Sequence, residues 1–167
     1  EGSQSNKILV ERGCVISIGS VRNPESLRSS DIKLVHASEV GLWGDNKKIK
    51  GDDLAQAIIA SVPNIPFSAI VLESTAKGIG NYFHRTWKGA EEGKNGFRPC
   101  FVAWFEIDMY WRAFRNEMDR AKFIASMSAE EWERWDLGAT LEGLHWYRYE
   151  LSVMQSDYRM KQEFPST

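Results

Sequence analysis

Two short polar segments contain residue types that can do chemistry, and each directly follows an apolar run. "HASE" (36–39) ends on a carboxylate, and "ESTAKG" (73–78) places two hydroxyls beside a glycine-containing turn. If the two apolar runs are neighbouring strands, Glu39 comes within reach of Ser74 and Thr75, and a carboxylate beside two hydroxyls can polarise a water molecule. The structural alternative is that Glu39 caps a strand end and the hydroxyls stabilise a turn.

The elements that must position these residues are predicted from apolar periodicity. Four segments are typical of strands: 14–21, 32–37, 68–75 and 98–105. The centre of the third is apolar throughout, as in a strand covered on both faces. Helices are predicted over 51–63, capped by Asp52 or Asp53, and from Asn81 to the "GKNG" turn. This alternation favours an α/β fold with a largely parallel sheet, whose ligands bind at the carboxyl ends of the strands.

The chain changes character after Asp108. Segment 110–163 carries several helix signals and almost no strand signal. Ser128 and Glu131 have the spacing of a capping box at the start of one helix. A second helical stripe is apolar except for Arg148. We therefore expect a helical region to follow the sheet.

Length, charge and cysteine content exclude several classes of protein. The 167 residues suffice for one domain with its own core. A net charge of −2 provides no general attraction to nucleic acid, so such contact needs a local basic patch. Two cysteines without a CxxC motif or clustered histidines indicate neither a disulfide framework nor a zinc site. Five of the seven tryptophans lie between 104 and 146, which indicates well-packed helices or an interaction surface, and we expect them to pack within helices.

Four segments together resemble a known family. "HASEVGLW", "VLESTAKGIGNYFHRTWKGAEEG", "FVAWF" and "LHWYRYELS…YRMKQEFPST" are similar to the large terminase subunit of tailed bacteriophages, over most of residues 12–167. Members of that family are motors that couple ATP hydrolysis to the translocation of double-stranded DNA into a procapsid. They combine a P-loop ATPase domain, RecA-like and of the additional-strand type, with a metal-dependent nuclease domain.

The resemblance implies a role for most of the polar residues identified above. Glu39 matches the Walker B glutamate, which orients water against the γ-phosphate. Ser38 falls at the position near nucleotide and Mg²⁺ where an aspartate is usual, so no direct metal ligand is expected. Ser74 and Thr75 fall in the coupling motif, which passes the hydrolysis state to the part that moves DNA. His36 is expected to pack or to support the site rather than to bind a ligand.

The resemblance also implies a layout for the chain. Residues 1–108 match a partial ATPase core, and residues 109–167 match a helical lid and linker region that leads to a nuclease domain. The chain contains no G-x-x-x-x-G-K-[ST] loop, and "GAEEGKN" (89–95) has the wrong spacing for a phosphate cradle. We therefore expect the C-terminal portion of a packaging ATPase domain that is inactive alone. ATP and Mg²⁺ are expected in the parent protein and not on this chain by itself.

The implied partners are double-stranded DNA, the portal protein, the small terminase subunit and, in the parent protein, further copies in a ring. No membrane contact is expected, because no apolar run approaches the ~20 residues of a membrane span. The implied location is the host cell cytoplasm. Strand edges left unpaired by a missing P-loop strand predict self-association. The competing hypothesis is a non-enzymatic module that docks DNA, the portal or the small subunit.

Four cations are candidates for contact with DNA or phosphate: Arg28, Lys77, Arg85 and Lys88. Backbone contacts of this kind give salt-sensitive binding. The alternative for each is an ordinary solvated charge. A serine hydrolase built on Ser74 is excluded, because no G-x-S-x-G elbow surrounds that serine.

Overall fold

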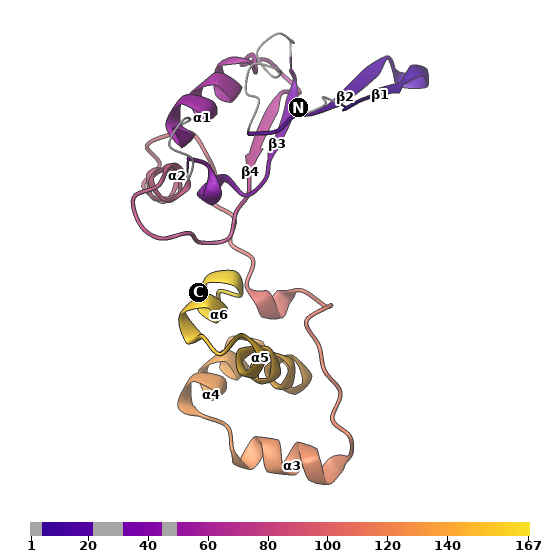
Figure 1. Cartoon of the computed structure of the whole chain (residues 1–167), viewed down its shortest axis with the longest axis vertical. Coiled ribbons are helices and arrows are strands. Elements are labelled where there is room, and N and C mark those ends of the chain that lie inside the picture. Colours follow the sequence, from indigo (N-terminus) through magenta and orange to yellow (C-terminus); the bar gives the residue numbers. More distant parts are fainter. Residues whose placement is uncertain (1–4, 22–31, 45–49) are drawn as a thin grey trace. The chain divides into compact units, whose positions relative to one another are not determined.

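The computed structural model describes residues 5–21, 32–44 and 50–167. The chain divides into two compact units, Glu1–Phe97 and Arg98–Thr167 (Figure 1). The described part of the first unit contains strands and helices, and the second unit is helical. The expected α/β class is therefore confirmed at this level. No described helix is long and apolar enough to cross a membrane.

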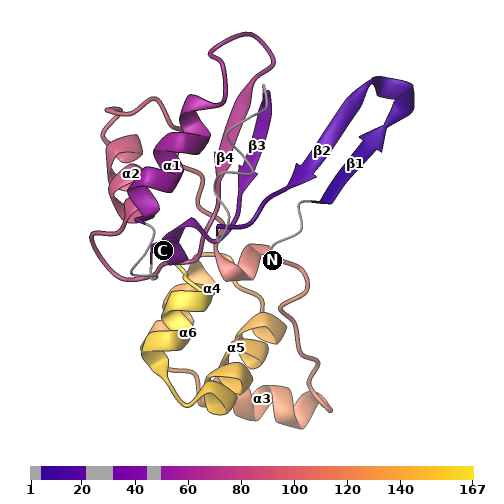
Figure 2. The same cartoon turned by 45° about the horizontal axis from the view of Figure 1, so that its top comes forward.

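The first unit is built around a parallel pair of strands, β3 (Leu34–Ala37) and β4 (Ala69–Leu72). Both predicted strands are confirmed over somewhat shorter spans. Parallel neighbours need a crossover connection, and the helix α1 (Gly51–Ala60) lies within it. The next helix, α2 (Tyr82–Glu91), follows β4, and Figure 2 shows both helices on the same side of the pair.

This one-sided packing corrects the expectation that β4 is covered on both faces. Ile70 and Leu72 are half-buried, whereas Ala69 and Val71 are exposed. Strand β4 alternates because the two helices cover a single face of the pair.

Helix α1 is held by an apolar face. Its buried side chains belong to Leu54, Ala55 and Ile58. The N-cap position is Lys50, which makes no side-chain cap bond, so the prediction that Asp52 or Asp53 caps the helix is wrong. Both aspartates lie in the first turn, where negative charge interacts favourably with the helix dipole.

The predicted strand at 14–21 forms as β2 (Cys14–Ile18), but its pairing differs from the expected parallel sheet. It pairs antiparallel with β1 (Ser5–Leu9) in a separate two-stranded sheet. The connection is a short 3-10 turn, η1 (Val10–Arg12), and Gly13 with φ 60°. So short a link permits only an antiparallel hairpin, because a parallel neighbour needs a long crossover.

The strand predicted over 98–105 does not form. This segment has no regular secondary structure and pairs with no strand among the described residues, and it ends in a short 3-10 helix, η4 (Trp104–Glu106). Its apolar residues serve the helical unit instead, since Ala103 and Trp104 are buried. The Trp104 amide donates to the Pro165 carbonyl at 3.2 Å, which joins the two ends of the second unit.

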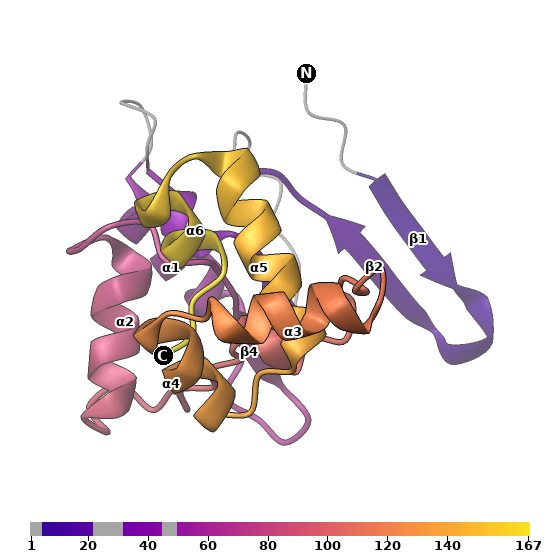
Figure 3. The same cartoon turned by 90° about the horizontal axis from the view of Figure 1, so that it is seen from below.

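Four helices complete the second unit (Figure 3). They are α3 (Glu117–Ala125), α4 (Ala129–Asp136), α5 (Leu141–Met154) and α6 (Asp157–Glu163). Each begins after a polar N-cap side chain that accepts a backbone hydrogen bond: Asn116, Ser128, Thr140 and Ser156. The predicted capping box at α4 is confirmed. Caps of this kind define where short helices start, because they satisfy otherwise unpaired N–H groups.

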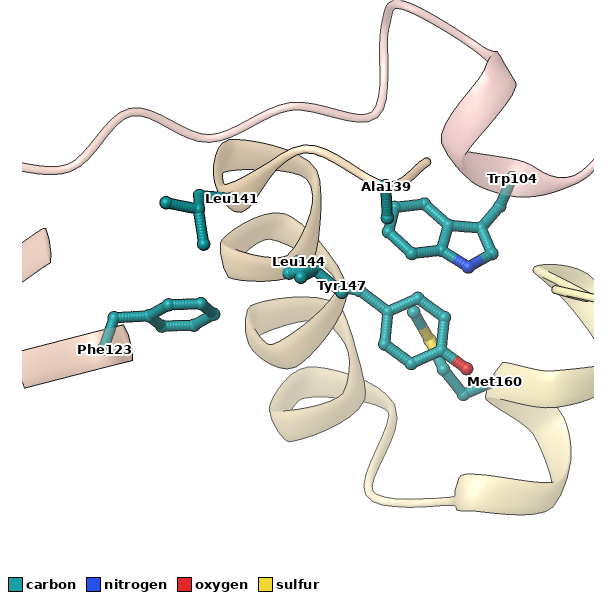
Figure 4. Packing of buried hydrophobic residues seen from close by; sticks show 7 residues of the cluster. All are labelled: Trp104, Phe123, Ala139, Leu141, Leu144, Tyr147 and Met160. Atoms are coloured by element: carbon teal, nitrogen blue, oxygen red, sulfur yellow. The ribbon is translucent and has the colours of Figure 1, made fainter. Parts of the chain in front are cut away.

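A compact apolar cluster holds these helices together (Figure 4). Its buried members are Trp104, Phe123, Ala139, Leu141, Leu144, Tyr147 and Met160. The half-buried ring of Trp146 packs against this cluster. It also stacks on the ring of Tyr110, with the two ring centroids 4.5 Å apart. The expectation that tryptophans pack in the helices holds for Trp104 and Trp146. It is wrong for Trp111, Trp132 and Trp135, which are 59%, 43% and 40% exposed.

The phenol of Tyr147 leads to a stability prediction. Its hydroxyl is buried and has no hydrogen-bond partner among the described residues, and burial raises its pKa. A buried polar group without a partner costs about 1–3 kcal/mol. We expect Tyr147→Phe to leave the free energy of unfolding unchanged or to raise it by about 1 kcal/mol. Chemical denaturation followed by circular dichroism measures this, and a clear loss of stability would contradict it.

Candidate functional site

The two polar segments meet at one edge of the first unit. In the parallel register Ala37 faces Leu72, so residues 38–39 and 73–75 leave their strands side by side. The Glu73 amide donates to the Ala37 carbonyl at 2.9 Å, and the Val40 amide donates to the Glu73 carbonyl at 3.1 Å. The two strands are therefore neighbours, which is the condition under which the two polar segments lie at one edge.

Glu39 occupies an unusual backbone conformation at this edge. It precedes the 3-10 turn η3 (Val40–Leu42) and has φ 55° and ψ 39°, in the left-handed region. That conformation costs an L-residue roughly 1–2 kcal/mol. The side chain is exposed, and its carboxylate has no hydrogen bond or ion pair within the described segments. Glu39 therefore presents to solvent a carboxylate that can accept hydrogen bonds from water.

Ser74 connects the two strand ends. Its hydroxyl accepts from the Gly41 amide at 3.0 Å and donates to the Thr75 carbonyl at 2.8 Å. The serine is half-buried, and both bonds hold its hydroxyl in one orientation. Ser74 is thus a structural link between the turn after Glu39 and the loop after β4, rather than a free nucleophile.

Ser38 lies beside Glu39 with its backbone held in place. The Trp43 indole donates to the Ser38 carbonyl at 3.2 Å, while the exposed hydroxyl has no partner within the described segments. One hydroxyl and one carboxylate suit contact with Mg²⁺ through its retained waters better than direct ligation. The described residues contain no group of three or more His, Cys, Asp or Glu side chains able to hold a metal.

Sequence reasoning overlooked a second carboxylate at the same edge. Glu73 pairs with His36, the Nε2 and Oε2 atoms being 3.2 Å apart, and both side chains are more than half exposed. A signal was available, because Glu73 directly precedes Ser74 and follows the strand that neighbours His36. Unlike Glu39, this carboxylate already has a cross-strand partner.

Two of the candidate DNA-contact cations already have carboxylate partners. Arg85 pairs with Asp52 and also donates to the Gly80 carbonyl. Lys88 donates to Glu91 at 2.8 Å, and this hydrogen bond raises the pKa of Lys88. These pairs reduce the positive charge that helix α2 offers to a phosphate backbone.

The other two candidates differ from these. Lys77 is exposed and has no ion pair within the described segments, and its Cβ lies close to Gly41 beside the turn η3. Arg28 lies outside the described residues. Among the described candidates, Lys77 is therefore the one without a carboxylate partner.

Comparison with protein-family models, with curated proteins and with solved structures finds no match for this chain.

Proposed function

We propose that the chain is part of the ATPase domain of a viral DNA-packaging motor, the large terminase subunit. In this proposal the first unit is a partial RecA-like P-loop NTPase core of the additional-strand type, and the second unit is the lid and linker region. The observation that carries the proposal is that the segments containing Glu39 and Ser74 leave neighbouring parallel strands and are joined by the Gly41–Ser74 hydrogen bond. The sequence resemblance over "HASEVGLW" and "ESTAKGIGN" supports it.

Glu39 has the properties that the proposed reaction requires. Its free carboxylate accepts a proton from, and orients, the water that attacks the γ-phosphate. In the parent protein, ATP would supply the phosphoanhydride bond and Mg²⁺ would neutralise its charge. Ser38 is the residue that would contact the hydrated ion. Because this chain contains no phosphate-cradling loop, we propose that it neither binds nor hydrolyses ATP alone.

Ser74 gives the strand edge a route for coupling. Any displacement of the turn after Glu39 pulls on Ser74 and on the loop that precedes helix α2, because one hydroxyl bonds to both segments. In the proposed motor this loop passes the hydrolysis state to the part that moves double-stranded DNA. The portal, the small terminase subunit and further copies in a ring are the proposed partners in the host cytoplasm.

The test is Glu39→Gln in a longer form of the protein that carries a phosphate-binding loop. We expect the rate of ATP hydrolysis to fall by about 10²–10⁴-fold, because the amide cannot accept the proton, while ATP–Mg²⁺ binding by calorimetry is unchanged. The matched control is Glu73→Gln, which alters the other carboxylate at this edge and is expected to retain most of the activity. Equal losses in both variants, or ATP binding by the 167-residue chain alone, would contradict the proposal.

A second candidate is a non-enzymatic docking module, favoured by the hairpin β1–β2. Four apolar side chains on it are about half exposed or more: Ile8, Val15, Ile16 and Ile18. A two-stranded hairpin is marginal in water without a covering partner. If neither the chain nor its longer form binds nucleotide, this function replaces the first.

A further inference from the structure

The left-handed backbone of Glu39 must be imposed by its surroundings. Among the described residues only Glu39, Phe67 and Gln155 have positive φ without being glycine. Nothing in a glutamate side chain favours this conformation, unlike the short side chains of asparagine and aspartate, which bond locally. Backbone strain of this kind persists only where surrounding contacts determine it.

The contacts that do so lie just after Glu39. Val40 is fully buried, and its amide is bonded to the Glu73 carbonyl. Gly41 is buried, and its amide donates to the Ser74 hydroxyl at 3.0 Å. Two successive residues after Glu39 are therefore attached to the neighbouring strand end.

Gly41 also fits this place by size. A Cβ at that position would lie 2.8 Å from Ser74 Oγ, 3.2 Å from the Thr75 carbonyl oxygen and 3.3 Å from the Lys77 Cβ. The φ of Gly41 is not positive, so the glycine is required for close approach and not for backbone freedom. The turn η3 packs against the loop after β4 because residue 41 has no side chain.

We infer that Gly41 is a positioning residue: its contact with Ser74 holds Glu39 in the left-handed conformation and so places the carboxylate. This inference rests on the proposed function for its consequence, since a displaced carboxylate no longer meets the attacking water. The contact itself is a property of the fold. It can be measured in the 167-residue chain without any activity.

The experiment compares glycine with alanine at position 39. In a left-handed position glycine is more stable than alanine, and in ordinary helical or extended backbone alanine is more stable than glycine. We expect Glu39→Gly to have a higher denaturation midpoint than Glu39→Ala in the natural background. In a Ser74→Ala background we expect the difference between these two midpoints to disappear or to change sign, because the backbone of residue 39 is released. An unchanged order would overturn the inference.

Phe67 provides the matched control, because it lies in the same unit, has φ 67° and is 94% exposed. The denaturation midpoint of Phe67→Gly should exceed that of Phe67→Ala, and the difference should be the same in the natural background and in the Ser74→Ala background. If Ser74→Ala does not fold, Ser74→Cys, whose larger thiol is a weak hydrogen-bond acceptor, takes its place. A change at position 67 equal to that at position 39 would show general loosening and overturn the inference.

The activity measurement separates this inference from the proposed function. In the longer, nucleotide-binding form, Ser74→Ala and Gly41→Ala should lower kcat with little change in KM, and Ser74→Thr should restore kcat because it keeps the hydroxyl. If the order at position 39 reverses but no form hydrolyses ATP, the positioning role stands and the proposed function fails. If Glu39→Gln abolishes hydrolysis but glycine at position 39 stays more stable than alanine in the Ser74→Ala background, the proposed function stands and the positioning role fails.

Discussion

Trp104→Ala is expected to lower the free energy of unfolding of the second unit by about 3–5 kcal/mol. The indole is 1% exposed, and its ring lies 4.8 Å from that of Tyr147 and 5.8 Å from that of Trp146, centroid to centroid. Its Nε1 donates to Ser166 Oγ at 3.1 Å. Truncation leaves a cavity in the middle of the cluster and removes a bond to the C-terminal segment.

The size of this loss is large compared with the total stability of a domain, about 5–15 kcal/mol. Denaturation followed by helical circular dichroism, with hydrogen exchange of the α5 amides, measures it for this unit. Trp111→Ala is the matched control, because Trp111 is 59% exposed. Its substitution should change stability by no more than about 0.5 kcal/mol. Similar losses in both variants would show that the core is not centred on Trp104.

The second large effect concerns Arg148, the one polar residue in the apolar stripe of α5. Its guanidinium donates from Nε to Glu131 Oε1 at 2.8 Å and from a terminal nitrogen to Oε2 at 2.6 Å. The other terminal nitrogen donates to Ser126 Oγ at 2.8 Å, and the group lies over the Phe123 ring. Glu131 is only 12% exposed and also caps α4 through Ser128. The pair therefore joins the end of α3 and the start of α4 to α5.

We expect Glu131→Gln to lower the free energy of unfolding by about 1.5–3 kcal/mol at neutral pH, because it removes charge-assisted hydrogen bonds. The double variant with Arg148→Met should lose less than the sum of the two single losses, since the groups act as a pair. The control is Glu117→Gln, whose side chain is 92% exposed and should have almost no effect. Additive losses in the double variant would contradict the paired role.

The same pair predicts a pH dependence. Burial raises the pKa of Glu131, but hydrogen bonds and charge from Arg148 and hydrogen bonds with Ser128 outweigh it, so the pKa lies below its ordinary value of 4.5. The unfolded state then binds the proton more readily, and the stabilisation is complete above pH 4.5 and is lost as the pH falls through the folded-state pKa. Denaturation midpoints against pH should converge for wild type and Glu131→Gln in acid. Parallel curves would contradict this.

Local patterns in the sequence sufficed for most elements of the fold. Apolar periodicity predicted β3, β4, α1 and α2, and the spacing of Ser128 and Glu131 predicted the capping box of α4. These features depend on residues close together in the chain. The α/β alternation favoured parallel pairing, but only the structure shows that β3 and β4 are neighbours.

The tertiary structure alone decided which predicted strands form and which charged side chains are paired. Segment 98–105 reads as a strand, yet it has no strand partner and gives Trp104 to the helical core. Arg85 was a candidate for DNA contact, yet it pairs with Asp52 from another helix.

At the site itself, the sequence identified Glu39 and Ser74 from their places after two apolar runs. It did not identify Gly41, whose importance is the absence of a side chain beside Ser74, or Glu73, whose partner is on the other strand. The physical reason is the range of the interactions. Periodicity and caps are determined within a few residues, whereas close approach and charge pairing depend on residues more than thirty positions apart.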